Sequence, residues 1–426
     1  MASKSYQILP LKPQVRVAFL GNVNNNWFLL CRMLLKEALY HPTLFVGKEE
    51  PYINHPISDL PDFDIDSCTW VENIGWLEMR LIRYFPNLCK TKSKLRDYDY
   101  CLLSSDYLPL AKVIKVPCIF FPSGADLTRL PFPSLDEQLR KPFTLKWLTR
   151  KLMGKNQRDG ILSCKKITSS VFPPFAESLE RLGVHKNDPK LTKTYLPLIM
   201  DLDLFSPSLN SEWPEELKNL RKDSEFIVFS PSRIIDIVNP TRIRVGSWKN
   251  TSALVHGFKI FLNSCALTFS ENIAPKLVFI DRSYSPDIQK IKDLIGNLDL
   301  EKNVIWLRAD NSEGFTRNQL RHFYTACDVV ADDFGVGWFG GVALEGLAFN
   351  KDVITHVPDK LMNSLFGSNP FSCCKEPNEI ALQLSRLYDL NVNSVYIPNT
   401  REWLEETQNP EVLLKVFKQI LDEVNS

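Results

Sequence analysis

A glycine-rich turn between an apolar strand and a helix contains the residues best suited to chemistry in this 426-residue chain. Val329–Ala331 is predicted to be a buried strand, and Val342–Phe349 a helix with Glu345 near its start. The turn between them contains Gly335, Gly337, Gly340 and Gly341. Glycines let a backbone approach a ligand closely, and a helix N-terminus offers unpaired N–H groups to an anion. The expected ligand of this turn is therefore a phosphate group.

Two other interpretations of the turn stay open. Gly335, Gly337 and Gly340 form a G-x-G-x-x-G pattern, and Asp352 could act as the acid that binds a dinucleotide ribose. That fingerprint normally follows the first strand of its domain, whereas several strand–helix units precede it here. A glycine-rich packing turn without a ligand is the second alternative.

Two cations lie where they could meet the same phosphate. The predicted strand Glu225–Ser230 is followed at once by Arg233, and Lys249 precedes a predicted helix. Both positions fall at the carboxyl edge of a parallel sheet, where ligands of such sheets bind. Arginine offers a fork for phosphate oxygens and lysine a point charge. Together with the glycine turn they predict a diphosphate site, although most loop cations are simply solvated.

The elements that must position these residues alternate along the chain. Val15–Leu20 reads as a strand, Gly21–Asn26 as an asparagine-rich loop and Trp27–Tyr40 as a helix. Further strands are predicted at Thr43–Val46, Tyr100–Leu103, Pro117–Phe121 and Lys166–Ser169. A break rich in proline, serine and aspartate follows at 201–214.

A second alternating run begins after the break. Its predicted strands are Glu225–Ser230, Lys276–Ile280, Asn303–Leu307, Val329–Ala331 and Asp352–Thr355, and its predicted helices are Ser252–Ser264, Pro286–Ile295, Thr316–Ala326, Val342–Phe349, Glu376–Tyr388 and Pro410–Val424. Such alternation indicates an α/β fold with parallel sheets covered on both faces. We therefore expect two doubly wound, Rossmann-like domains facing across a cleft, at 1–200 and 201–400. The helix in 401–426 could cross back to the first domain.

Composition excludes several classes of protein. The net charge of +1 argues against nucleic-acid binding. The ten cysteines form no C-x-x-C pair, no secretory signal begins the chain, and no apolar run reaches the length of a membrane span. The six histidines show no H-x-x-x-H or H-x-H spacing, so a metal site is not expected. These features favour a cytoplasmic protein.

Two basic segments in the first half, 80–96 and 140–158, contain no acidic residue. The second interleaves its cations with Phe143, Leu145, Trp147, Leu148 and Leu152. This mixture suits a peripheral contact with anionic lipid. A pair of solvated surface helices is the alternative.

At this point the residues resemble the nucleotide-sugar-dependent glycosyltransferases of the GT-B fold, of the retaining family 4 type. Residues 195–207, YLPLIMDLDLFSP, resemble that family's interdomain segment PNGVDLDRFSP. Arg233 and Lys249-Asn250 resemble its arginine-then-KG pair. The stretches at 344–348 and 351–354 resemble LEAMA and GKPVI, 121–127 resembles HGSDL, and Asp333-Phe334 resembles the DQF of a subgroup.

The resemblance implies roles for the matching positions. Arg233 and Lys249 would hold the donor diphosphate and stabilise it as a leaving group. Glu345 would hydrogen-bond the donor ribose, and Asp333, Gly337, Phe339, Gly340, Gly341 and Val342 would surround the donor. Gly21, Asn22, Gly124 and Asp126 would lie on the acceptor side. The implied enzyme is a hexosyl- or related transferase that uses a nucleotide sugar and a carbohydrate or lipid-linked acceptor, and needs no metal.

The chain departs from the family in ways that leave other functions open. The family has two glutamates separated by seven residues, but the first position is Gly337 here. Ser123 replaces the family histidine, and the segment between Arg233 and Lys249 is longer than usual. A catalytically silent subunit that binds nucleotide or glycan is the main alternative, and a sugar-nucleotide epimerase a further one.

Overall fold

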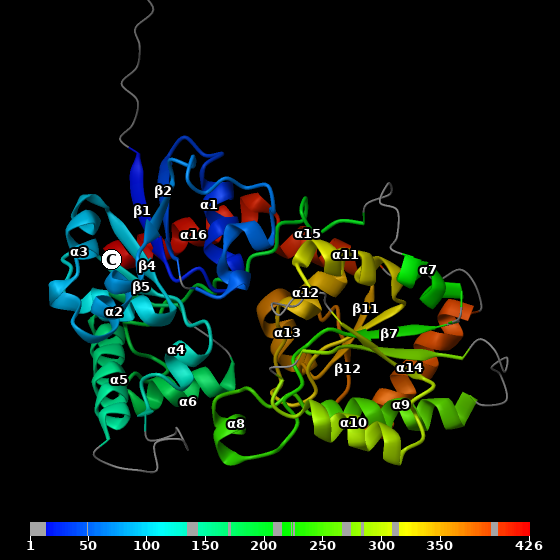
Figure 1. Ribbon diagram of the computed structural model, residues 1–426. Helices are drawn as coiled ribbons and strands as arrows, with labels where there is room; N and C mark the ends of the chain where they lie inside the picture. The colour runs from blue at the N-terminus through cyan, green and yellow to red at the C-terminus, as the bar shows by residue number, and fades with distance from the viewer. Residues whose placement is uncertain are drawn as a thin grey trace, which may run out of the picture.

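Two α/β domains lie side by side in the computed structural model (Figure 1). The structure describes residues 14–48, 50–133, 144–168, 172–207, 215–222, 224, 226–265, 274–282, 285–308, 315–392 and 399–426. Arg140, Lys141 and Phe143 of the second basic segment, and Ser169 and Glu225 of two predicted strands, lie outside these residues.

The first domain is built on a six-stranded sheet of order β3-β2-β1-β4-β5-β6, in which every pair of neighbours is parallel. The strands are β1 Val15–Leu20, β2 Tyr40–Gly47, β3 Val71–Ile74, β4 Tyr100–Leu103, β5 Cys118–Phe120 and β6 Lys166–Ile167. The helices are α1 Asn26–Leu34, α2 Trp76–Tyr84, α3 Thr91–Lys94, α4 Ala125–Thr128, α5 Leu145–Ser163 and α6 Pro173–Arg181. The predicted helix over Trp27–Tyr40 is too long, since Tyr40 starts β2.

The second domain repeats this topology with the order β12-β11-β10-β7-β8-β9, again all parallel. Its strands are β7 Ile227–Ser230, β8 Lys276–Ile280, β9 Val304–Leu307, β10 Val329–Ala331, β11 Asp352–Thr355 and β12 Ser372–Cys373. Its helices are α7 Glu215–Lys222, α8 Pro240–Arg244, α9 Thr251–Cys265, α10 Ile288–Asn297, α11 Arg317–Ala326, α12 Gly341–Ala348, α13 Asp359–Phe366, α14 Pro377–Val392 and α15 Thr400–Thr407. Both sheets thus have the doubly wound order expected from the alternation of strands and helices.

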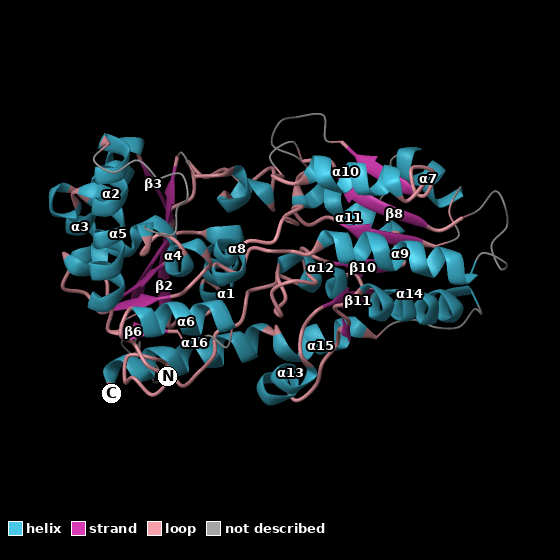
Figure 2. Ribbon diagram, turned by 90° about the horizontal axis from the view of Figure 1, so that it is seen from below, coloured by secondary structure: helices cyan, strands magenta, loops and turns pink. Residues whose placement is uncertain are grey.

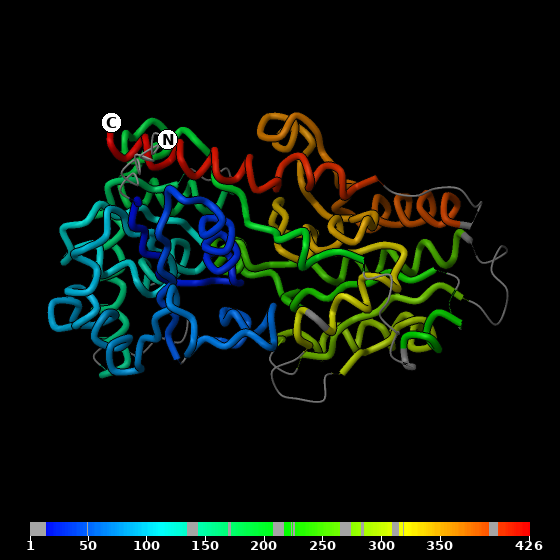
Figure 3. The backbone as a smooth tube through the Cα atoms, turned by 90° about the horizontal axis from the view of Figure 1, so that it is seen from above, coloured from blue at the N-terminus to red at the C-terminus, as the bar shows by residue number. Residues whose placement is uncertain are grey.

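Apolar cores cover both faces of each sheet, which explains why the strands are continuous apolar runs. The last helix, α16 Pro410–Asn425, joins the core of the first domain. Its Phe417 packs against the rings of Phe19 and Tyr40, with centroids 6.0 and 5.7 Å away. In Figure 3 this helix runs along the first domain, so the chain ends on the domain in which it began. Within the described residues no helix is both long and apolar enough to cross a membrane.

The connection between the domains is tied to both of them. Arg401 of α15 in the second domain donates hydrogen bonds to the carbonyls of Leu202 and Phe205. The carboxylate of Asp201 accepts hydrogen bonds from the backbone N–H groups of Asp203 and Leu204, and it pairs with Arg32 of α1 at 2.6 Å. The Asn26 side chain accepts a hydrogen bond from the N–H of Ile199. These contacts hold the segment that joins the two domains, whose two sheets are drawn in magenta in Figure 2.

Candidate functional site

The glycine turn follows β10 at the switch point of the second sheet, where β10 lies beside β7. Asp333, immediately after the strand, shapes the turn because its Oδ1 accepts hydrogen bonds from the N–H groups of Gly335 and Val336 at 2.8 and 3.0 Å. Gly337 has φ +76°, a conformation that favours glycine. Gly337 occupies the position of the family glutamate. A Cβ at this position would lie 3.6 Å from the imidazole of His356.

The turn ends at the N-terminus of α12, which no side chain caps. Backbone N–H groups of its first turn therefore lack intrahelical partners, and the helix dipole favours an anion there. Phe339 is buried, and its ring packs against Phe371 with centroids 5.2 Å apart. Because the ring packs into the core, only the backbone of Phe339 is available to a ligand of the turn.

Lys249 lies against the turn. Its Nζ is 2.9 Å from Asp333 Oδ2 and 3.6 Å from Asp332 Oδ1, and its carbonyl accepts the N–H of Phe334. Burial alone would lower the pKa of Lys249, but the two aspartates outweigh it and the pKa is raised. Lys249 is therefore a permanent cation, and an ammonium has a third N–H to offer a ligand.

Arg233 follows β7 at the same edge of the sheet, and it is exposed. The hydroxyl of Ser232, the residue before it, donates a hydrogen bond to Asp332, whose carboxylate also lies 3.6 Å from Nζ of Lys249, so the two cations flank the same aspartate. No ion pair joins Arg233 to any other described residue. The structure thus brings together Arg233, Lys249 and the glycine turn.

Glu345 of α12 is buried beside the turn. Its Oε2 accepts a hydrogen bond from the Tyr324 hydroxyl at 2.6 Å, and its Oε1 lies 3.6 Å from Nε of Arg317. Burial raises the pKa of Glu345, although Arg317 and Tyr324 act in the opposite direction.

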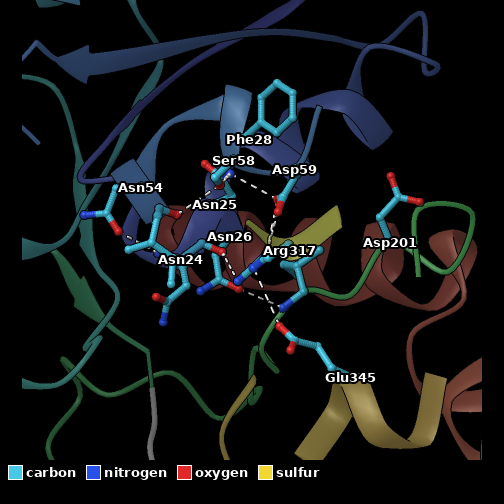
Figure 4. Close-up of polar contacts among 12 residues, drawn as sticks. Asn24, Asn25, Asn26, Phe28, Asn54, Ser58, Asp59, Asp201, Arg317 and Glu345 are labelled. Carbon is cyan, nitrogen blue, oxygen red and sulfur yellow. Dashed lines mark hydrogen bonds and ion pairs between the residues drawn. The ribbon is translucent and has the colours of Figure 1, made fainter. Parts of the chain in front are cut away.

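Arg317, the first residue of α11, connects Glu345 to the other domain (Figure 4). Its guanidinium donates to both oxygens of Asp59 at 3.1 and 3.2 Å and to the carbonyl of Asn24 at 3.1 Å. Sequence reasoning missed this residue. The available signal was the capping box of Thr316 and Gln319, which starts a helix at the carboxyl edge of the sheet with Arg317 in its first turn.

The asparagine-rich loop after β1 supports this contact from inside the first domain. Asn22 is fully buried and donates to the Asn25 side chain and the Asn54 carbonyl, while its Oδ1 accepts the N–H of Phe28. Asn25 in turn donates to Asp59 at 3.0 Å. The side chain of Asn22 therefore stabilises the conformation of the loop through these hydrogen bonds.

The other predicted acceptor-side residues lie in the loop after β5. Asp126 is buried and accepts hydrogen bonds from the N–H groups of Ser105, Ser123 and Gly124. Gly124 has φ +137° and open space around its Cα, so its backbone is accessible to a ligand. Gly21 is different, since a Cβ there would lie 2.3 Å from the Ser104 carbonyl oxygen.

The long segment between Arg233 and Lys249 reaches the same loop. It is anchored in its own domain by the ion pair of Arg242 with Asp287. It then contacts the first domain, where the Thr128 hydroxyl lies 3.3 Å from the Val245 carbonyl oxygen and 3.0 Å from that of Gly124, and so can donate to either. The segment therefore joins the Lys249 side of the cleft to the loop that contains Gly124 and Asp126.

No metal centre is evident in the parts of the chain that the structure describes, where no three His, Cys, Asp or Glu side chains form a group that could hold an ion.

Comparison with known proteins identifies the fold. No family model matches the chain, and no curated protein matches it. Among solved structures, Anabaena Alr3699/HepE in complex with UDP and glucose aligns with a TM-score of 0.59 and 14% identity, over 97% of this chain and 100% of that one. A glycosyltransferase from Rickettsia africae gives the same TM-score, identity and coverage. Sucrose-phosphate synthase from Thermosynechococcus elongatus gives 0.57 and 15%, over 96% and 99%.

These similar structures share the two facing Rossmann-like domains. The chain thus has the GT-B fold, as its alternating elements and motifs predicted. The identity is too low to carry more than the fold from those proteins to this one.

Proposed function

We propose that the protein is a glycosyltransferase that moves a sugar from a nucleotide-diphosphate sugar to a carbohydrate or lipid-linked acceptor. The observation that carries the proposal is the group formed by Arg233, Lys249 and the uncapped N-terminus of α12 around the glycine turn of a GT-B fold. Breaking a sugar–phosphate bond builds negative charge on the diphosphate, and fixed positive groups aimed at it lower the barrier. HepE, which is similar in fold, was crystallised with UDP-glucose.

Lys249, Arg233 and the N-terminus of α12 would stabilise the diphosphate in different ways, because their charges are balanced to different extents. The carboxylates of Asp332 and Asp333 more than balance the single charge of Lys249, so Lys249 acts as a positioned N–H donor. Arg233, which has no ion pair with the described residues, brings the uncompensated positive charge, and the α12 backbone adds its partial charge. Glu345 binds the donor ribose, and Gly124 lies on the acceptor side.

The proposal includes retention of the anomeric configuration, because residues 195–207, 344–348 and 351–354 resemble family 4. The absence of a glutamate at 337 means that no carboxylate from that position assists the reaction. A proton nuclear magnetic resonance spectrum of the first-formed product, taken before mutarotation, would test this part separately.

The decisive experiment measures release of nucleoside diphosphate from a panel of nucleotide sugars. Slow release is expected with one donor, and Arg233→Ala should reduce its rate roughly 10²–10³-fold, the usual effect of removing one group that stabilises developing charge. Lys249→Ala should also suppress release, but it leaves two buried aspartates unpaired and so disturbs folding as well. Arg233 is exposed, which makes it the cleaner variant.

Lys302→Ala provides the matched control, because Lys302 is an exposed cation in a turn of the same domain, outside the site. An unchanged rate in Arg233→Ala would contradict the proposal. Nucleotide binding without any turnover, even with candidate acceptors present, would instead favour a catalytically silent GT-B subunit.

A further inference from the structure

The two basic segments of the first domain come together in the folded chain. Asn156 of α5 donates hydrogen bonds to the carbonyls of Arg83 and Tyr84, both at 3.0 Å, so α5 packs on the end of α2. In both Figure 1 and Figure 2, α2, α3 and α5 lie at the end of the first domain that is farthest from the second. These helices are therefore accessible without disturbing the cleft.

Large apolar side chains are exposed on α2 and α5 and in the turn that follows α2. Trp76, Phe85, Leu88, Leu145, Leu148 and Leu152 expose between 36% and 78% of their surface, and we call them the apolar face. The three leucines occur at i, i+3 and i+7, a spacing that places them on one side of α5. The buried residues of α5 begin only at Met153, so its first two turns present leucine to the outside. Clusters of this kind mark interaction sites.

Exposed cations lie in the same segments as the apolar face, and most of the nearby acids have partners. Glu78 of α2 accepts hydrogen bonds from the backbone N–H groups of Lys90 and Thr91, whereas Asp97 is exposed and forms no ion pair with the described residues. Lys90, Lys146 and Lys151 are exposed and form no ion pair with the described residues. Asp159 pairs with Lys112 and Lys155, and Asp106 pairs with Arg83. Arg80 and Lys151 lie over the rings of Trp76 and Trp147, at 5.0 and 3.8 Å from the ring centroids. The same helices and their ends thus expose both large apolar side chains and unpaired lysines.

We infer that this face docks the protein on a bilayer surface that contains anionic phospholipid. Leucine and aromatic side chains would enter the boundary between headgroups and acyl chains, while the lysines meet the lipid phosphates. The composition argues against other occupants. Protein interfaces are depleted in lysine, and a second copy of the chain would bring like charges together. The inference is independent of the reaction in the cleft.

Sedimentation of the full-length protein with phospholipid vesicles tests this inference. Vesicles of phosphatidylcholine with about one third phosphatidylglycerol should bind the protein at low salt, and binding should fall steeply as salt screens the lysines. Lys146→Gln with Lys151→Gln should weaken partitioning about 25-fold, from roughly fivefold per surface charge. Leu148→Ser with Leu152→Ser should weaken it at least tenfold, because the two substitutions remove apolar surface that would leave water on binding.

Matched controls come from the second domain. Leu382 of α14 is 68% exposed and Lys302 is an exposed turn residue, so Leu382→Ser and Lys302→Gln change the same residue types away from the face. Both controls should bind vesicles like the parent protein. The double variants change exposed residues outside the donor site, so nucleotide-dependent thermal stabilisation should persist in them.

Three results would overturn the inference. The first is no vesicle binding at low salt. The second is equal binding to phosphatidylcholine alone that salt does not change. The third is self-association in the ultracentrifuge that Leu148→Ser with Leu152→Ser abolishes, since the apolar face would then be covered by another copy of the chain.

Discussion

At the scale of single residues, burial controls the charge of the proposed donor site. Burial raises the pKa of Glu345, and Arg317 and Tyr324 only partly oppose the shift. Lys249 stays protonated because Asp332 and Asp333 raise its pKa despite its burial. The acid that would bind ribose therefore titrates closer to neutrality than an ordinary glutamate, while the lysine does not titrate in the working range.

This difference predicts an acid-sensitive affinity for nucleotide. The ionised carboxylate of Glu345 accepts hydrogen bonds from ribose hydroxyls, and protonation removes an acceptor. Because the pKa is raised, affinity should begin to fall on acidification at a pH above the ordinary glutamate value of 4.5. Calorimetric titration with the nucleoside diphosphate over a pH series measures it.

Glu345→Gln isolates the residue from titration of the ligand itself. The variant should bind more weakly at neutral pH, and its affinity should show a flatter pH dependence than that of the parent protein. If both proteins lost affinity in parallel on acidification, Glu345 would not be the titrating group.

At the scale of elements, loops at the carboxyl edges of the two sheets place the site. In the first domain the loop after β1 approaches Ser104 so closely that Gly21 has no room for a side chain, and its φ is +90°. The buried amides of Asn22 and Asn25 then fix the loop against residues 54–59. This loop forms a rigid support for Asp59.

Gly21→Ala should destabilise the first domain. The new Cβ would overlap the Ser104 carbonyl, and L-residues avoid this φ, so we expect a cost of about 2–4 kcal/mol from overpacking and strain. Thermal unfolding followed by circular dichroism measures the loss. Gly75→Ala is the control, because no atom lies within 4 Å of its Cβ position and its φ is ordinary at −71°. Equal midpoints of thermal unfolding for Gly21→Ala and Gly75→Ala would contradict the close approach of residue 21 to the Ser104 carbonyl.

At the scale of the whole molecule, contacts on two sides join the domains across the cleft. Arg317 pairs with Asp59, and the segment before Lys249 meets Thr128 and Phe172. The Arg317–Asp59 pair is almost fully buried, with side chains 11% and 1% exposed. Loss of one partner from such a pair leaves the other charge without compensation.

Arg317→Gln should therefore lower the free energy of unfolding by about 3–5 kcal/mol. It should also let the domains separate, which small-angle scattering would detect as a larger radius of gyration. Adding Asp59→Asn to this variant should restore part of the stability, with an interaction energy of about 1–3 kcal/mol in the double-mutant cycle. Strictly additive effects would show that the pair does not couple the domains.

The sequence by itself determined the alternation of strands and helices, and hence the two parallel sheets and their active edges. It also placed Arg233, Lys249 and the glycine turn at one edge, because chain order fixes the end at which a βα loop emerges. The positions of strands and helices follow from local apolar patterns. These patterns predicted the end of α1 wrongly, since the apolar pattern of the helix continues from Leu34 to Tyr40, where β2 begins.

Only the tertiary structure decided how charges meet across the cleft. Arg317 and Asp59 are 258 residues apart in the chain, and no sequence motif around either residue predicts a contact with the other. Burial of Asn22, pairing of Lys249 with two aspartates, and the union of α2 and α5 into one face also depend on contacts between distant segments. Local patterns record the preferences of a segment, whereas such contacts are set by the packing of whole domains, which no single segment encodes.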